Sequence, residues 1–159
     1  MRPRAIFCTV GTGMGERAEA PRGDPKTRRV LVVDDDEGVL EMLCAAARGE
    51  GFQVCGAADG SKALEMVSQE SFDLVVLDLM LPRLGGFEIL RRLQGVREDL
   101  PVLVITGRYT DPSASNLIRQ ERNVAGFLEK PVRPAAFAAV LHGILKTSAG
   151  PEGGAGAGL

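Results

Sequence analysis

The sequence predicts an α/β fold with a doubly wound, parallel sheet of five strands. Between about residues 28 and 146, short apolar runs alternate with segments of helical periodicity, and three of the runs are apolar at every position. Such runs are typical of parallel strands that helices cover on both faces. Because crossovers between parallel strands are right-handed, the helices lie on both sides of the sheet, and ligands bind at the carboxyl ends of its strands.

Five runs are the predicted strands. They are residues 30–33 (VLVV), 53–57 (QVCGA), 74–77 (LVVL), 102–105 (VLVI) and 126–128 (GFL). The first, third and fourth contain no polar residue, so we predict that they are the central strands.

Each predicted helix has an apolar stripe at helical spacing. The stripes are Val39, Leu40, Leu43 and Ala47; Ala63, Leu64 and Val67; Phe87, Leu90 and Leu93; Ala114, Leu117, Ile118 and Val124; and Phe137, Val140, Leu141, Ile144 and Leu145. Residues 49–51 (GEG) end the first helix and the Asp59-Gly60 turn precedes the second. Asp111 is the predicted N-cap of the fourth helix, and Pro134 opens the fifth.

Both ends of the chain differ from its middle. Residues 1–27 have no apolar period and residues 148–159 are rich in glycine, so we expect flexible tails around one domain at 28–147. The glycines of residues 11–15 (GTGMG) lack the spacing of a phosphate loop. With 159 residues, 45% of them hydrophobic, the chain can bury one core without disulfides.

Composition excludes several functional classes. The three cysteines, Cys8, Cys44 and Cys55, form no CxxC pair, which argues against a disulfide framework or a zinc site and favours a reducing compartment. A net charge of -2 and the lack of tryptophan argue against nucleic-acid binding. No segment approaches the roughly 20 apolar residues of a membrane-spanning helix, and no export signal is evident, so we expect a cytoplasmic protein.

Acidic residues follow two of the predicted central strands. The first strand is followed by Asp34, Asp35, Asp36 and Glu37, and the third by Asp78. A helix N-cap explains Asp36 or Glu37 but not the other three acids. Brought to one edge of the sheet, those three would repel one another unless a cation lay between them. Mg²⁺ suits this site better than Ca²⁺, because magnesium commonly binds carboxylates together with a phosphoryl group.

The other two strand ends carry groups that suit a phosphoryl ligand. Thr106 closes the fourth strand with a hydroxyl and is followed by Gly107, which leaves room beside it. Lys130 follows the fifth strand and offers an ammonium group. A threonine or a lysine at such a position is usually an ordinary surface residue. Together with the acids, however, Thr106 and Lys130 indicate a magnesium-assisted phosphoryl site.

The motifs that carry these residues resemble the receiver domain of two-component response regulators. They are residues 31–36 (LVVDDD), 74–82 (LVVLDLMLP), 85–87 (GGF), 102–107 (VLVITG) and 126–132 (GFLEKPV). The resemblance covers about residues 28–146 and implies a flavodoxin-like (βα)5 fold with strand order 2-1-3-4-5. It also implies that Asp78 accepts the phosphoryl group, and that Asp34, Asp35, Asp78 and the carbonyl of Met80 hold Mg²⁺.

The resemblance further implies how the phosphoryl group is bound and sensed. Thr106 and Lys130 would contact it, Phe127 would be a switch aromatic, and the bond before Pro131 would be cis. Two features depart from the family pattern: Gly107 stands where alanine is usual, and the stretch from Thr106 to Lys130 is about two residues longer.

The partners implied are a sensor histidine kinase or histidine phosphotransfer protein and a downstream effector protein. A homodimer through the fourth helix, fifth strand and fifth helix is also possible. No DNA-binding or ATPase segment follows Lys146. We therefore expect a stand-alone regulator that is not an enzyme, binds neither nucleic acid nor membrane directly, and gives its output by protein binding.

Two alternatives remain open at this stage. In a haloacid dehalogenase-like phosphatase, Asp34 would be the nucleophile of an Asp34-x-Asp36 motif and Thr106 would form a second motif. At the position where that motif has threonine or valine, this chain has Gly38. The late acidic motif and the cap domain of such phosphatases are also missing from the sequence. The other alternative is a degenerate receiver that binds partners without phosphorylation, although every residue type of the acceptor site is present.

Overall fold

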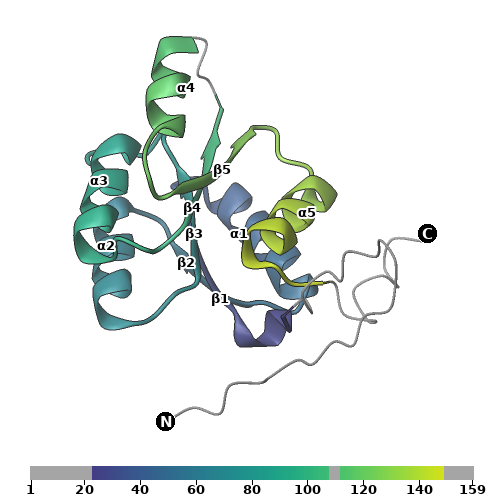
Figure 1. The fold of residues 1–159 in the computed structure, drawn as a ribbon. Coiled ribbons are helices and arrows are strands. Elements are labelled where there is room, and N and C mark those ends of the chain that lie inside the picture. The colour runs from purple at the N-terminus through teal and green to yellow at the C-terminus, as the bar shows by residue number, and fades with distance from the viewer. Residues whose placement is uncertain (1–22, 108–111, 149–159) are drawn as a thin grey trace, which may run out of the picture.

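Five parallel strands form one sheet in the order β2-β1-β3-β4-β5 (Figure 1). The computed structural model describes residues 23–107 and 112–148. The strands are β1 (Arg29–Val33), β2 (Gln53–Ala57), β3 (Leu74–Asp78), β4 (Val102–Thr106) and β5 (Val124–Glu129). This confirms the predicted fold class, the strand order, and the central place of the three fully apolar runs.

Helices cover both faces of the sheet. They are α1 (Glu37–Gly49), α2 (Gly60–Gln69), α3 (Gly86–Val96), α4 (Pro112–Arg119) and α5 (Pro134–Leu145). In Figure 1, α1 and α5 lie on one side of the sheet, and α2, α3 and α4 lie on the other. Side chains alternate accordingly: Val30 and Val32 join the core under α1 and α5, whereas Leu31 and Val33 join the core on the opposite face. This alternation places both cores against fully apolar strands.

Three residues of the predicted helical stripes differ from that prediction, one in its element and two in their exposure. Val124 begins β5 instead of continuing α4, because the helix ends at Arg119 and Val102 of β4 donates a hydrogen bond to the carbonyl of Asn123. Leu117 is 61% exposed, and among the described side chains of α4 it is Ile118 that reaches the core. Phe87 is 38% exposed at the start of α3, where Ile89 is fully buried instead. Asp111 and the side chain of Ala114 lie outside the described residues.

The folded unit begins before residue 28. A short 3-10 helix, η1 (Pro25–Thr27), precedes β1, and the amide of Gly23 donates to the carbonyl of Lys146 at 2.8 Å. Pro25 is buried. Residues 23–27, which the sequence assigned to a tail, thus contact the body of the fold because both ends of the folded unit meet there. The rest of the predicted tails, including the glycines of residues 11–15, lies outside the described residues.

Two of the three cysteines lie among the described residues. Cys44 and Cys55 are free thiols, and they lie in the cores on opposite faces of the sheet. Cys8 lies outside the described residues.

Across residues 23–107 and 112–148, every helix is too short or too polar to cross a bilayer.

Candidate functional site

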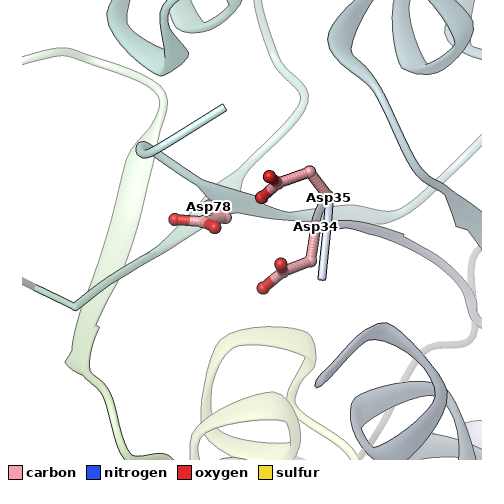
Figure 2. A group of neighbouring side chains, drawn as sticks. All are labelled: Asp34, Asp35 and Asp78. Carbon is pink, nitrogen blue, oxygen red and sulfur yellow. The ribbon is translucent and has the colours of Figure 1, made fainter. Parts of the chain in front are cut away.

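Three carboxylates meet where β1 and β3 end (Figure 2). Asp34 follows β1, Asp35 comes next, and Asp78 is the last residue of β3. One carboxylate oxygen from each residue lies within 4.8 Å of the others. Asp34 and Asp78 are buried, whereas Asp35 is exposed. The acids that the sequence predicted to converge therefore do so.

Local turns orient the two buried carboxylates in the same way. Oδ1 of Asp34 accepts a hydrogen bond from the amide of Asp36 at 2.9 Å, and Oδ1 of Asp78 accepts one from the amide of Met80, also at 2.9 Å. Each is an aspartate bonded to the backbone two residues on, an arrangement that aspartate favours at strand ends. The second oxygen of each carboxylate is left for other partners.

Lys130 supplies that partner for both carboxylates. Its ammonium lies 2.8 Å from Oδ2 of Asp34 and donates a hydrogen bond to Oδ2 of Asp78 at 3.1 Å. The backbone holds the lysine there, because its amide donates a hydrogen bond to the carbonyl of Thr106 at 2.9 Å. The bond between Lys130 and Pro131 is cis, as the resemblance implied. A positive charge thus stands where the repulsion between the acids requires one.

The pKa values follow from this arrangement. Burial raises the pKa of the Asp34 carboxyl, and the negative charge of Asp78 adds to this, although hydrogen bonds from Lys130 and the Asp36 amide oppose it. Burial lowers the pKa of Lys130, but hydrogen bonds to Asp34 and Asp78 outweigh that effect and leave the pKa raised. The lysine is therefore charged at neutral pH. Because its single positive charge faces three acids, the site still favours additional positive charge.

Thr106 ends β4 with a buried hydroxyl. The residue is 1% exposed, and its Oγ1 has no hydrogen-bond partner among the described residues. Leaving such a group unsatisfied costs about 1–3 kcal/mol. β4 pairs with β3, and Ile105 is the register partner of Asp78. The unpartnered hydroxyl of Thr106 therefore lies one strand away from the carboxylates. Packing alone does not favour a polar group without a partner at such a buried position.

Phe127 lies on the same face of the sheet as Thr106. Val104 belongs to the core under α2, α3 and α4, and Thr106, two residues on, points to the same side. Phe127 is the register partner of Val104 and packs against that core. The ring is half-buried, and the guanidinium of Arg119 lies 4.4 Å from its centroid. Phe127 could be identified from the sequence as a candidate switch residue, but Arg119 could not, because no periodicity in the sequence links the two residues.

The loop after β3 depends on a glycine whose role the sequence analysis did not identify. A Cβ atom at Gly86 would lie 2.3 Å from the backbone Cα of Leu79, and the Gly86 amide donates to the Leu79 carbonyl at 3.2 Å. Because a backbone atom cannot easily move aside, only glycine fits there. Gly86 thus fixes the turn that carries Asp78 and Met80.

Asp36 has a structural role. It is the N-cap of α1, and its Oδ1 accepts a hydrogen bond from the amide of Val39 at 3.1 Å. The predicted capping role of Asp36 is confirmed. One oxygen of its carboxylate is therefore engaged by the helix.

Comparison with known proteins decides the family. The family model of the response regulator receiver domain matches residues 30–142. The chain belongs to this family. The receiver domain is a signalling domain of two-component systems rather than a conventional enzyme, and domains of this kind generally bind Mg²⁺ at an acidic pocket. The phosphatase alternative is thereby left without support.

Individual relatives agree with this assignment. The chain is 37% identical over 128 residues to the response regulator MprA of Mycolicibacterium vanbaalenii, which covers 80% of this chain and 54% of that protein. The chain thus spans about half the length of the curated relatives that it matches.

Solved receiver structures match in three dimensions. A CheY-like receiver domain protein from Methanospirillum hungatei superposes with a TM-score of 0.69 at 27% identity and covers 74% of this chain and 93% of its own. A putative response regulator from Chloroflexus aurantiacus gives 0.67 at 30% identity, with 79% and 98% covered.

Proposed function

We propose that Asp78 of this receiver domain accepts a phosphoryl group from a phosphohistidine of a sensor kinase or phosphotransfer protein, in a Mg²⁺-dependent reaction. One observation carries the proposal. Two buried carboxylates, a half-buried lysine and a buried threonine hydroxyl without a partner gather at the ends of neighbouring strands. Acid, cation and hydroxyl together are what phosphoryl transfer to a carboxylate requires.

The sheet order favours Asp78 over Asp34 as the acceptor. β3 lies between β1 and β4, so Asp78 is adjacent both to the Asp34 strand and to the Thr106 strand. A phosphoryl group on Asp78 would lie next to Lys130 and Thr106, whereas one on Asp34 would be a strand further from the threonine. The Asp78 oxygen would form a bond to phosphorus as the bond from phosphorus to the donor nitrogen breaks, and that nitrogen keeps the electron pair.

The residues present fit a magnesium ion. The carboxylates of Asp34, Asp35 and Asp78 are hard oxygen ligands within reach of one another, and we propose that the Met80 carbonyl completes the protein's share. When bound, the ion would neutralise the clustered carboxylates and the phosphoryl oxygens. Lys130 would then move from pairing the two acids to pairing a phosphoryl oxygen.

Thr106 and Phe127 would relay the modification. A phosphoryl group on Asp78 offers the unpartnered Thr106 hydroxyl a charge-assisted hydrogen bond, which draws it towards the strand end. The ring of Phe127, two register positions away on the same face, could then turn inward. This would change the surface of α4, β5 and α5, and we propose that an effector protein or a second copy of the receiver binds there.

We propose that this receiver works in the cytoplasm and that its own output is phosphorylation-dependent protein binding.

Labelling by a phosphohistidine donor or acetyl phosphate tests the chemistry. We expect one Mg²⁺-dependent phosphoryl group, labile to hydroxylamine as an acyl phosphate is, that Asp78→Asn does not accept and Asp34→Asn accepts poorly. Labelling of Asp78→Asn at the wild-type level, or undiminished labelling in excess chelator, would contradict the proposal. Turnover of acetyl phosphate through Asp34 would restore the phosphatase alternative, and an absence of all reaction would favour the degenerate receiver.

A further inference from the structure

One contact at the proposed switch has no part in the acceptor chemistry. The guanidinium of Arg119, in the last turn of α4, lies 4.4 Å from the centre of the Phe127 ring in β5. A cation within about 6 Å of an aromatic centroid is attracted by the negative ring face. Arg119 itself is exposed, so this contact does not require the arginine to be buried.

The ring of Phe127 has two different neighbourhoods. On the inner side it packs against the core under α2, α3 and α4, on the face of the sheet that also carries Thr106. On the outer side it borders a shallow hollow that Arg119, Val124, Ala125, Gly126 and Phe127 line. The guanidinium therefore contacts the ring beside this hollow, and an inward rotation of the ring would break that contact.

The anchoring of α4 makes the contact more important than it would be elsewhere. Ile118 is the α4 side chain that reaches the core among those described, while Leu117 beside it is 61% exposed. A helix with so little buried apolar surface is held to the sheet by few favourable contacts. The cation over Phe127 is one of them, so the ring position and the helix position are coupled.

We propose that Arg119 is a positioning residue that holds Phe127 in the half-buried position of this structure and so opposes activation of the receiver. The inference rests on the proposed function and adds a regulator to it. Because the contact exists only while the ring lies under the guanidinium, it stabilises one of two ring positions. An exposed cation–π contact of ordinary strength corresponds to about a two- to fivefold shift in such an equilibrium.

A purely structural role for Arg119 gives a different expectation. A cation in the last turn of a helix also interacts favourably with the helix dipole. If that were its main contribution, Arg119→Lys would behave as wild type, and Arg119→Met would lower the free energy of unfolding without affecting activation. If the ring contact matters, Arg119→Met favours the activated state, and the effect requires Phe127.

The chain offers a matched control. Arg91 on α3 lies 5.2 Å from the centre of the Phe87 ring, so Phe87→Leu removes a similar contact while Arg91 keeps its 3.8 Å ion pair with Glu121. The probe is beryllofluoride with Mg²⁺, a phosphoryl mimic that needs no kinase. Its affinity is measured for wild type, Arg119→Met, Arg119→Lys, Phe87→Leu, and Phe127→Leu with and without Arg119→Met. Fluorophenylalanine NMR, with the Phe127 signal assigned by its loss in Phe127→Leu, reports the ring directly.

We expect Arg119→Met to bind beryllofluoride two- to fivefold more tightly and to move the Phe127 signal towards its position in the beryllofluoride-bound wild type. Arg119→Lys should fall between wild type and Arg119→Met, and Phe87→Leu should match wild type. Unchanged affinity in Arg119→Met, or equal tightening when Phe127 is leucine, would overturn the inference alone. A wild-type protein that binds no beryllofluoride would instead refute the proposed function on which the inference rests.

Discussion

Three consecutive aspartates at the end of β1 have three separate environments. Asp34 is buried and paired with Lys130, Asp35 is exposed beside the other acids, and Asp36 caps α1. Composition alone cannot distinguish them, because the same side chain occurs three times in a row. The direction in which each leaves the strand determines whether it serves the site or the helix.

Substitution of Asp35 and Asp36 by alanine should therefore have opposite consequences. Asp35→Ala should weaken Mg²⁺ binding and phosphotransfer yet leave stability unchanged or slightly higher, since it removes one of three repelling charges. Asp36→Ala should lower the free energy of unfolding by about 0.5–2 kcal/mol through loss of the cap, with Mg²⁺ binding largely retained. Magnesium titration and chemical denaturation of both variants check this, and a stable Asp36→Ala protein that no longer binds magnesium would contradict it.

Among the elements, the loop between β3 and α3 is the most constrained. It carries Asp78 at one end and Met80 within it, and Gly86 closes it against the backbone of Leu79. The neighbouring Gly85 has open space around a Cβ position. Two adjacent glycines thus differ completely in what they tolerate.

Gly86→Ala should destabilise the protein by about 1–3 kcal/mol, because the new methyl group forces the loop backbone aside. Gly85→Ala is the matched control and should remain close to wild type. Thermal unfolding measures the first effect, and the rate of phosphorylation should fall only for Gly86→Ala, since its loop positions the acceptor. Equal stability of the two variants would show that the loop relaxes without cost.

The limits of sequence-based prediction also appear at this scale. The run Leu74–Leu77 is apolar throughout and correctly predicted a central strand, and Asp78, which follows the run, joins the other acids as the sequence predicted. Phe87 was predicted to be inside because it fits a helical stripe, but the stripe does not show that Ile89 takes the buried position instead. Arg119 over Phe127 was unpredictable, since it depends on where α4 lies relative to β5.

At the scale of the whole molecule, the two ends of the described fold meet at the edge opposite the carboxylates. Gly23 pairs with the segment after α5, where Thr147 is fully buried. His142 lies between, with Nδ1 2.7 Å from Oγ1 of Thr147 and Nε2 2.8 Å from Oε2 of Glu50. This cluster ties the amino-terminal segment to the ends of α1 and α5.

A shortened chain tests where the domain begins. A version covering residues 23–148 should unfold as the full chain does, whereas one covering 28–148 should lose about 1–3 kcal/mol of stability. The shorter version lacks the hydrogen bonds from Gly23 to Lys146 and from Gln53 to Lys26, each contributing about 0.5–1.5 kcal/mol. Denaturant titration distinguishes the two versions. Identical midpoints would mean that residues 23–27 contribute nothing to the fold.

Signalling across the molecule should depend on Thr106. Thr106→Ala keeps the carboxylates and Lys130, so it should still accept a phosphoryl group, but its partner affinity or dimerisation should no longer respond. The variant should also be at least as stable as wild type, since a buried hydroxyl without a partner is removed. Analytical ultracentrifugation with and without acetyl phosphate gives the answer. An undiminished response would show that the signal takes another route.

Locating the phosphoryl group tests the central claim most directly. Borohydride reduces an aspartyl phosphate to homoserine, so mass spectrometry of the phosphorylated, reduced and digested protein identifies the modified residue. We expect homoserine at position 78 and unmodified aspartate at positions 34 and 35. The homoserine should form only when Mg²⁺ is present during phosphorylation. Homoserine at position 34 or 35, or phosphorylation on a side chain other than aspartate, would contradict it.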